Sequence, residues 1–286
     1  MSQRKHRARI IVALLIIAVV AVFATNWYMN KNAYASYYTY TSDNLPSEFD
    51  GYKIAVISDI HNSRYYDKII EQLDEQSPDL IVFSGDMVQQ PASDLKSTVK
   101  IAESQKGKCK MYAVFGNHEA ENGAVIRENI ASELEENGIS VLANSSADIE
   151  IGDSKIRLIG IEDVGQKIFE DEEIDKIKNA VESNIADEAF NILICHRASL
   201  YPKLKDLPVD LIISGDLHGG VIRLPFVGGL IGEGEEKFLP EYTSGEYKEG
   251  DDSAEMIVSR GCDYNIKKMR IFNPPDIPII TLKTAD

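Results

Sequence analysis

The sequence has few cysteines for its length. Three occur in 286 residues, at Cys109, Cys195 and Cys262. Three cysteines cannot form a disulfide framework, and the odd number leaves at least one free thiol or one intermolecular bond. Cys195 ends an apolar run, so we expect it to be a small core residue. A bridge between Cys109 and Cys262 stays open, because sequence alone does not give its geometry.

Basic side chains are also scarce. Lysine and arginine number 30 against 46 acidic residues, which gives a net charge of −16. Residues 1–30 hold four bases and no acid, so the remainder carries 26 − 46 = −20. Sequence-independent binding to nucleic acid relies on Lys and Arg neutralising phosphates. We therefore expect no nucleic-acid binding, whereas a small anionic substrate is still allowed, since bound metal ions reverse the potential locally.

Three further features are absent. No repeat of 20–50 residues occurs, and no linker divides residues 51–286, so this stretch is expected to form one domain. The glycine-rich segment "GGLIGEGEE" lacks the strand–turn–helix context of a dinucleotide-binding fingerprint. We interpret it as a loop.

One long hydrophobic run is present near the N-terminus. The uncharged segment at residues 10–24 follows the basic "RKHRAR", and extending it to Trp27 and Tyr28 gives about the 20 residues that a bilayer requires. An uncleaved anchor is favoured, with the two aromatic residues at the outer interface. A cleaved signal peptide and a buried core helix are the alternatives.

The basic residues before the run keep that end in the cytoplasm. We predict a basic cytoplasmic tail at residues 1–9, a single-pass membrane anchor at residues 10–28 and a stalk with an edge strand at residues 29–50. The acidic body then lies outside the cytoplasm, tethered to the cell membrane, or secreted if the segment is cleaved.

From residue 52 onward, short apolar runs alternate with segments of helical periodicity. Strands that are apolar on both faces and alternate with helices predict an α/β fold with a largely parallel sheet. A hairpin-like pair turning at Gly152-Asp153, together with strands near the C-terminus, suggests a second sheet.

The few histidines lie in similar positions. His6 is in the basic tail, and the other four stand at or just after the end of an apolar run, while a fifth run ends on Asp86. Ligands of α/β sheets bind at the carboxyl ends of the strands. Five strand ends are therefore expected to bring a set of polar side chains to one edge: Asp59 and His61, Asp86, Asn117 and His118, His196, and Asp216 and His218.

Any one of these residues could be an ordinary turn former or helix cap. The same explanation would have to apply at five strand ends at once, so we reject it for the set as a whole. Carboxylate, carboxamide and imidazole groups together are ligands for Mn, Fe or Zn ions. Glycines at positions 85, 116 and 215 would let the chain turn sharply and point the next side chain over the strand ends.

Five blocks in this order resemble a known family: Asp59-x-His61, Gly85-Asp86, Gly116-Asn117-His118-Glu119, an isolated His196, and Gly215-Asp216-Leu217-His218. They are similar to the calcineurin-like metallophosphoesterases, and flanks such as "HGGVIRLPFVGG" are similar to the bacterial membrane-anchored branch. The resemblance covers roughly residues 52–220. It implies a four-layer αββα sandwich with two divalent metal ions.

The resemblance also implies residue roles. Asp59, His61 and His218 would hold one metal, and Asn117, His196 and the residue at 216 the other. Asp86 would bridge the two ions, and a hydroxide between them would attack phosphorus. His118 would act catalytically, by stabilising the transition state or protonating the leaving oxygen. Glu119 is expected either to cap a helix or to orient His118.

The sequence departs from the family at Asp216, where the usual residue is histidine. With the extra carboxylate, the net charge of two divalent ions, the Asp ligands and a hydroxide falls from +1 to zero. We therefore expect Mn to be favoured, with Fe or Zn as alternatives. A half-occupied or inactive site is the competing interpretation.

Substrate contacts are less clearly indicated. Asn62 is expected to line the pocket, and Arg223 and Arg197 either meet a substrate phosphate or form structural salt bridges, as does Arg260. The favoured function is hydrolysis of phosphodiesters or pyrophosphates, including lipid-linked or nucleotide-sugar substrates. A non-catalytic metal-bound domain that binds an envelope partner and a phosphomonoesterase or protein phosphatase are the alternatives.

Overall fold

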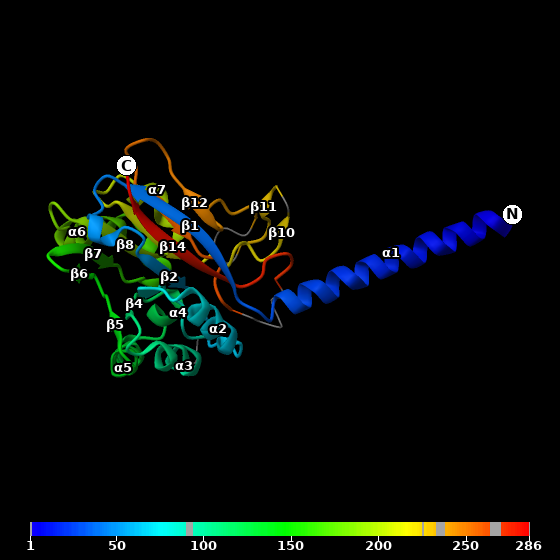
Figure 1. Ribbon diagram of the computed structural model, residues 1–286, viewed down its shortest axis with the longest axis horizontal. Helices are drawn as coiled ribbons and strands as arrows, with labels where there is room; N and C mark the ends of the chain where they lie inside the picture. Colours follow the sequence, from blue (N-terminus) through cyan, green and yellow to red (C-terminus); the bar gives the residue numbers. More distant parts are fainter. Residues whose placement is uncertain (1, 90–93, 225, 233–237, 264–269, 286) are drawn as a thin grey trace.

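The computed structural model describes residues 2–89, 94–224, 226–232, 238–263 and 270–285. Two six-stranded sheets form the body of the molecule (Figure 1). The first sheet has the order β1 (Tyr34–Ser42), β14 (Asp276–Thr284), β2 (Lys53–Ile57), β3 (Leu80–Phe83), β4 (Lys110–Ala113) and β5 (Ile139–Val141). The second has the order β12 (Gly245–Tyr247), β13 (Glu255–Val258), β9 (Leu211–Gly215), β8 (Phe190–Arg197), β7 (Ser154–Gly160) and β6 (Ser145–Ile151).

Both sheets are parallel at their centres. In the first, β2, β3, β4 and β5 run parallel, with Ile54 opposite Leu80. In the second, β13, β9, β8 and β7 are parallel, and the predicted hairpin forms the antiparallel pair β6–β7 at the edge. Parallel strands need both faces covered, which explains their continuous apolar runs.

Three apolar clusters define the layers. One lies between the two sheets and contains Val56 and Ile192. A second joins the first sheet to α2 (Tyr66–Gln76), α3 (Lys96–Gln105) and α5 (Ala124–Glu136). A third joins the second sheet to α6 (Asp171–Asn184) and α7 (Tyr201–Leu204). The order of helices, sheet, sheet and helices confirms the predicted αββα sandwich.

Short elements complete the chain. They are α4 (Asn117–Ala120), the 3₁₀ helices η1 (Ser47–Phe49), η2 (Gly165–Phe169) and η3 (Ala198–Leu200), and the two-residue strands β10 (Arg223–Leu224) and β11 (Gly228–Gly229). All three cysteines are free, so the bridge between Cys109 and Cys262 is absent. Cys195 is buried in the core, as expected.

Helix α1 (Ser2–Met29) projects from the body as one long helix (Figure 1). Its segment Lys5–Met29 is long and apolar enough to cross a membrane, and its most hydrophobic window is not buried, which argues against a core helix. The end of the helix contacts the body, because Asn26 and Asn30 are buried and both donate to the carbonyl of Arg270 at 2.8 Å.

Four residues separate the end of α1 from β1, which is an edge strand, as the sequence predicts within residues 29–50. It pairs in parallel with β14 over nine residues, from Tyr34 opposite Asp276 to Ser42 opposite Thr284. Strand β14 therefore lies between β1 and β2, although it is the last strand of the chain.

Candidate metal centre

The seven predicted metal-binding side chains come from separate strand ends. Asp59 follows β2, Asp86 follows β3, Asn117 opens α4 directly beyond β4, His196 lies near the end of β8, and Asp216 follows β9. His61 and His218 each stand two residues beyond the first and last of these carboxylates. Strands of both sheets thus contribute to one location.

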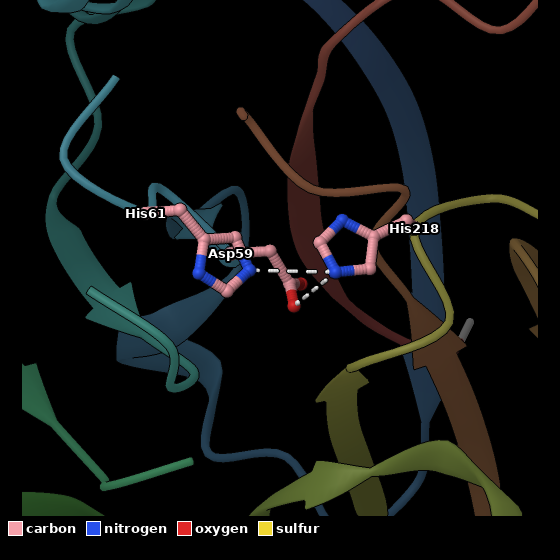
Figure 2. A group of neighbouring side chains, drawn as sticks. All are labelled: Asp59, His61 and His218. Carbon is pink, nitrogen blue, oxygen red and sulfur yellow. Dashed lines mark hydrogen bonds and ion pairs between the residues drawn. The ribbon is translucent and has the colours of Figure 1, made fainter. Parts of the chain in front are cut away.

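Asp59, His61 and His218 form one group of potential metal ligands (Figure 2). The two histidine Nε2 atoms are 3.4 Å apart, and His218 Nε2 lies 3.6 Å from Asp59 Oδ1. The imidazole rings are stacked, with 5.1 Å between their centroids. This spacing lets one cation contact all three side chains.

Asp86 occupies the centre of the site. Its Oδ2 atom lies 3.7 Å from His61 Nε2, 3.5 Å from His196 Nε2 and 3.9 Å from His118 Nε2. Asp86 also belongs to two groups of potential metal ligands, one with His61 and His118 and one with Asp59 and His196. Its position between the histidines is the one that a bridging carboxylate requires.

Among the predicted metal-binding residues, three buried polar atoms make no hydrogen bond to the part of the chain that the structure describes. They are Asp59 Oδ1, Asn117 Oδ1 and His196 Nε2. The other oxygen of Asp59 accepts hydrogen bonds from Ser58 Oγ at 2.5 Å and from the Asp216 amide at 3.2 Å. Buried polar atoms normally have partners. Two oxygens and a nitrogen without one, beside the carboxylate of Asp86, fit divalent cations.

Hydrogen bonds from Nδ1 fix the orientation of three imidazoles. His196 Nδ1 lies 2.7 Å from the Ser84 carbonyl, and His61 Nδ1 lies 3.1 Å from the Val88 carbonyl. His218 Nδ1 lies 3.1 Å from Asp263 Oδ1. When Nδ1 carries the proton, the lone pair of Nε2 faces the site, which is the usual arrangement for a metal-binding histidine.

Comparison with known proteins agrees with this geometry. Residues 52–220 match the model of the family described as calcineurin-like phosphoesterase. The chain belongs to the calcineurin-like phosphoesterase family. It is therefore a phosphoester hydrolase of the metallophosphoesterase type, as the five sequence blocks predict.

Named relatives extend over most of the chain. The uncharacterized metallophosphoesterase YkuE of Bacillus subtilis (strain 168) is 30% identical over 259 residues, covering 87% of this chain and 85% of that protein. Phosphodiesterase YaeI of Escherichia coli (strain K12) is 30% identical over 195 residues, covering 65% and 67%. Among solved structures, calcineurin-like phosphoesterase YfkN of Bacillus subtilis is 14% identical with a TM-score of 0.41, covering 79% of this chain and 80% of that one.

Asp216, the departure from the family pattern, points into the metallophosphoesterase site. Its Oδ1 atom lies 3.7 Å from His196 Nε2, and the side chain is only 15% exposed. Burial raises the pKa of Asp216 to about 6, although the charges of His196 and Arg197 oppose this shift. A nearby cation would stabilise the ionised form of this carboxyl group and so lower its pKa.

The electrostatics of the site centre on Asp86 and His196. Burial disfavours the charged form of both groups, but the charge of each group stabilises the charged form of the other. The pKa of Asp86 is lowered by the charges of His196 and His61, and that of His196 is raised well above its usual value by Asp86, Asp59 and Asp216. In the absence of a cation, a proton on His196 compensates the surrounding carboxylates.

Glu119 does more than cap a helix or orient His118, the two roles expected from the sequence. It does cap its helix, since Oε2 accepts from the Gly116 amide at 2.8 Å. The same oxygen accepts from the Asp86 amide, and Oε1 accepts from the Val88 amide, each at 2.9 Å. The fully buried carboxylate therefore joins the loop after β3 to the loop after β4. Burial, and then the charge of Asp86, raise the pKa of Glu119 to about 7.

The backbone of the site is strained. Five of the predicted metal-binding residues have a left-handed φ, namely Asp59, His61, Asp86, Asp216 and His218, with values between 45° and 77°. Such a conformation costs non-glycine residues roughly 1–2 kcal/mol each. Strained backbone of this kind is typical of functional sites, where it fixes side-chain directions.

The glycines next to these residues serve close packing more than turning, which corrects the sequence interpretation. Gly85 does have a positive φ of 107°, but Gly116 has an extended backbone with φ −93° and ψ −170°. A Cβ at Gly116 would overlap with Oδ1 of Asp86, and a Cβ at Gly215 would overlap with Oγ of Ser58. Both positions need glycine because another chain segment lies directly against them.

The predicted substrate-binding side chains have structural partners. Arg197 Nε donates to Asp163 Oδ2 at 2.6 Å, and Arg260 pairs with Asp276 at 2.9 Å. Arg223 Nη1 donates to the Gly219 carbonyl at 2.8 Å. Asn62 donates to Asp94 at 2.8 Å and accepts from Ser97 Oγ at 2.8 Å. These contacts favour the structural interpretation of Arg197 and Arg260, and direct contact of any of these residues with substrate stays a prediction.

Sequence reasoning missed Asp263 and Arg270. The Asp263 carboxylate is hydrogen-bonded to His218 Nδ1 and forms an ion pair with the guanidinium of Arg270. The charge of Arg270 keeps the pKa of Asp263 well below its usual value, although burial opposes the shift. The only available signal was that Asp263 follows the apolar run of β13. A carboxylate behind a metal-binding histidine orients the ring and strengthens it as a ligand.

Proposed function

We propose that the protein is a metal-dependent phosphodiesterase that acts at the outer face of the cytoplasmic membrane. The observation that carries the proposal is a set of three buried atoms without a hydrogen bond, on Asp59, Asn117 and His196, around the Asp86 carboxylate. The printed name of the relative YaeI, a phosphodiesterase, supports diesters as the substrate class. Pyrophosphate bonds are a second substrate with the same chemistry.

We assign Asp59, His61 and His218 to one cation and Asn117, His196 and Asp216 to the other, with Asp86 between them. When bound, the cations supply Lewis-acid activation of water and of the phosphoryl oxygens. Two divalent ions would offset the Asp59, Asp86 and Asp216 carboxylates. The oxygen-rich donor set favours Mn over Zn.

His118 is the proposed proton donor to the leaving oxygen. It is the most accessible of the four site histidines, with 23% of its side chain exposed against 7% for His61 and His218 and 1% for His196. Its Nε2 atom lies 3.9 Å from Asp86 Oδ2, and its ring packs edge-on against that of His61 at 4.5 Å. A histidine reachable from solvent can exchange protons with a substrate.

The membrane location rests on α1. Its segment Lys5–Met29 has the length and hydropathy of a membrane span, and the basic residues precede the apolar run. Basic flanks favour the cytoplasmic side, which leaves the phosphoesterase domain on the opposite side. Protease treatment of intact spheroplasts tests this orientation, because only an external domain would be digested.

The activity is tested with bis-p-nitrophenyl phosphate and p-nitrophenyl phosphate in the presence of Mn, Fe or Zn. We expect the diester to be hydrolysed faster, with Mn most effective. Asp86→Ala should reduce turnover by about a hundredfold or more, since outer partners of metal ligands alone contribute 10–100-fold. Asp206→Ala is the matched control, because Asp206 is a carboxylate with 77% exposure.

Other outcomes would replace the proposal. Preference for the monoester would identify a phosphomonoesterase or protein phosphatase. Metal binding without hydrolysis of either substrate would indicate a non-catalytic domain, and a single bound ion would contradict the two-metal assignment of Asp216.

A further inference from the structure

A group of exposed apolar side chains lies on the hairpin that follows His218 and on the segment around Phe272 that pairs with it. Leu224 is 41% exposed, Val227 58% and Phe272 49%, and Phe226 is fully exposed. We refer to these four residues as the apolar rim. Single exposed apolar residues are common on proteins, but a contiguous group marks an interaction surface.

Three of the four rim residues share one surface cavity, and Val227 directly follows Phe226 in the chain. Leu224, Phe226 and Phe272 line one cavity of about 480 Å³ together with Arg223 and Gly228. The hairpin is fixed to the segment before Phe272, since the Arg223 amide donates to the Ile271 carbonyl at 2.9 Å. Side chains from two separate parts of the chain thus meet on one surface.

The rim lies at the level where α1 meets the body. The Phe272 amide donates to Asn26 Oδ1 at 2.8 Å, and Asn26 Nδ2 donates to the Arg270 carbonyl at 2.8 Å. Figure 1 shows β10 and β11 beside this end of the helix. The next residues of α1, Trp27 and Tyr28, are 54% and 64% exposed. Tryptophan and tyrosine are the residues that prefer the membrane–water interface.

The length of α1 determines the position of the bilayer relative to the body of the protein. The 25 residues of Lys5–Met29 extend about 38 Å at 1.5 Å per residue, which exceeds a hydrocarbon core of about 30 Å. An anchor that spans the bilayer therefore brings Trp27 and Tyr28 to its outer surface. Because Asn26 holds the segment of Phe272, the rim reaches the same surface.

We propose that the apolar rim is a second membrane contact, with Leu224, Phe226, Val227 and Phe272 inserted into the outer surface of the lipid bilayer. This inference rests on the proposed role of α1 as an uncleaved anchor. Continuity with the anchor favours lipid over a second protein, because any surface beside Trp27 and Tyr28 meets lipid first. Shallow insertion of exposed aromatic and aliphatic side chains is typical of interfacial binding.

The rim is also joined to the metal centre. Asn273 Nδ2 donates to the His218 carbonyl at 2.7 Å, and Arg223 contacts the carbonyl of Gly219, the next residue. Insertion of the rim therefore keeps the residues around His218 close to the lipid headgroups. The substrate class that fits this placement is an amphiphilic phosphodiester whose apolar part stays in the membrane.

Depth-dependent fluorescence quenching tests the proposal with the full-length protein in nanodiscs of brominated phosphatidylcholine. The chain has one tryptophan, Trp27, whose quenching reports on the anchor alone. In a Trp27→Phe background, Phe226→Trp reports on the rim. Val125→Trp is the matched control, because Val125 is 71% exposed on α5, far from α1 (Figure 1).

We expect bromine near the headgroups to quench Phe226→Trp at least twofold and to leave Val125→Trp unchanged. Quenching of wild-type Trp27 without quenching of Phe226→Trp would overturn the rim proposal and leave the anchor intact. Absence of Trp27 quenching would instead refute the anchor. Protection of Phe226→Trp from acrylamide in a dimeric nanodisc sample, without quenching by lipid, would show that a second copy covers the rim and would also overturn it.

Discussion

At the scale of single residues, Asp216 distinguishes this site from the pattern that its family usually shows. A carboxylate replaces an imidazole within 3.7 Å of His196, and burial raises its pKa to about 6. The same side chain sits near Asp59, whose Oδ2 accepts from the Asp216 backbone amide. A cation bound between these groups therefore meets more negative charge and one nitrogen donor fewer.

Replacing this carboxylate tests its effect on metal choice. We expect Asp216→His to raise the ratio of Zn-supported to Mn-supported diester hydrolysis by about tenfold, because imidazole suits Zn whereas carboxylate suits Mn. Initial rates with each metal measure the ratio. Asp206→His, at an exposed position, is the control. An unchanged ratio would show that the residue at 216 does not contact the metal.

At the scale of elements, the site depends on how closely the loops after β3 and β4 approach each other and the end of β8. Gly85 lies against the ring of His196 and against Gly116, and Glu119 bonds to amides of both neighbouring loops. The positions of the predicted metal-binding side chains therefore depend on backbone contacts between segments far apart in the sequence.

A single methyl group tests this packing. In Gly85→Ala, the new Cβ would lie 2.9 Å from the Gly116 Cα and overlap with the His196 ring, at a φ of 107°. We expect a loss of about 2–4 kcal/mol in the free energy of unfolding, from backbone strain and overpacking together. Urea unfolding followed by circular dichroism measures it.

Gly250→Ala separates the two causes. Gly250 has a similar φ of 93°, but a Cβ there would meet no atom within 4 Å. We expect a loss of about 1–2 kcal/mol from strain alone. Equal losses in the two variants would mean that the contact with His196 and Gly116 is not the limiting factor at Gly85.

At the scale of the whole molecule, cation binding and protonation compete. Burial lowers the pKa of His196, but Asp86, Asp59 and Asp216 outweigh it and raise that pKa well above 6.5. Burial and Asp86 raise the pKa of Glu119 from 4.5 to about 7. Both groups hold protons more tightly in the folded protein than in the unfolded chain.

The metal-free protein should therefore become less stable as the pH rises from about 4.5 through 7, where folded Glu119 loses its proton, and further above 6.5 through His196, because the folded state gives up protons that it binds preferentially. Chelator-treated samples should show a falling Tm over this range. Metal-loaded samples should show a flat or rising Tm, since metal ions bind more tightly once His196 is deprotonated. A rising Tm in the metal-free samples would contradict the expectation.

Much of the site was predictable because its residues directly follow apolar strands. The ends of β2, β3, β8 and β9 can be read as runs of apolar letters, and parallel strands place their carboxyl ends together. Asp263, Arg270 and the bonds of Glu119 to the Asp86 and Val88 amides were not predictable, since their partners lie 7 to 45 residues away and are chosen by the topology. The contact of Asn26 with Arg270 spans 244 positions and has no local signal.

The insertion of β14 between β1 and β2 has a consequence for biogenesis. In the proposed topology the chain is exported from its N-terminal end, so β1 and β2 emerge before residues 276–284, the strand that pairs with both of them. We expect prematurely terminated chains to be inert and to expose an open strand edge, the kind of surface that quality-control proteases and aggregation both exploit. Hydrolytic competence would thus depend on β14, a strand far along the chain from the two strands that it joins.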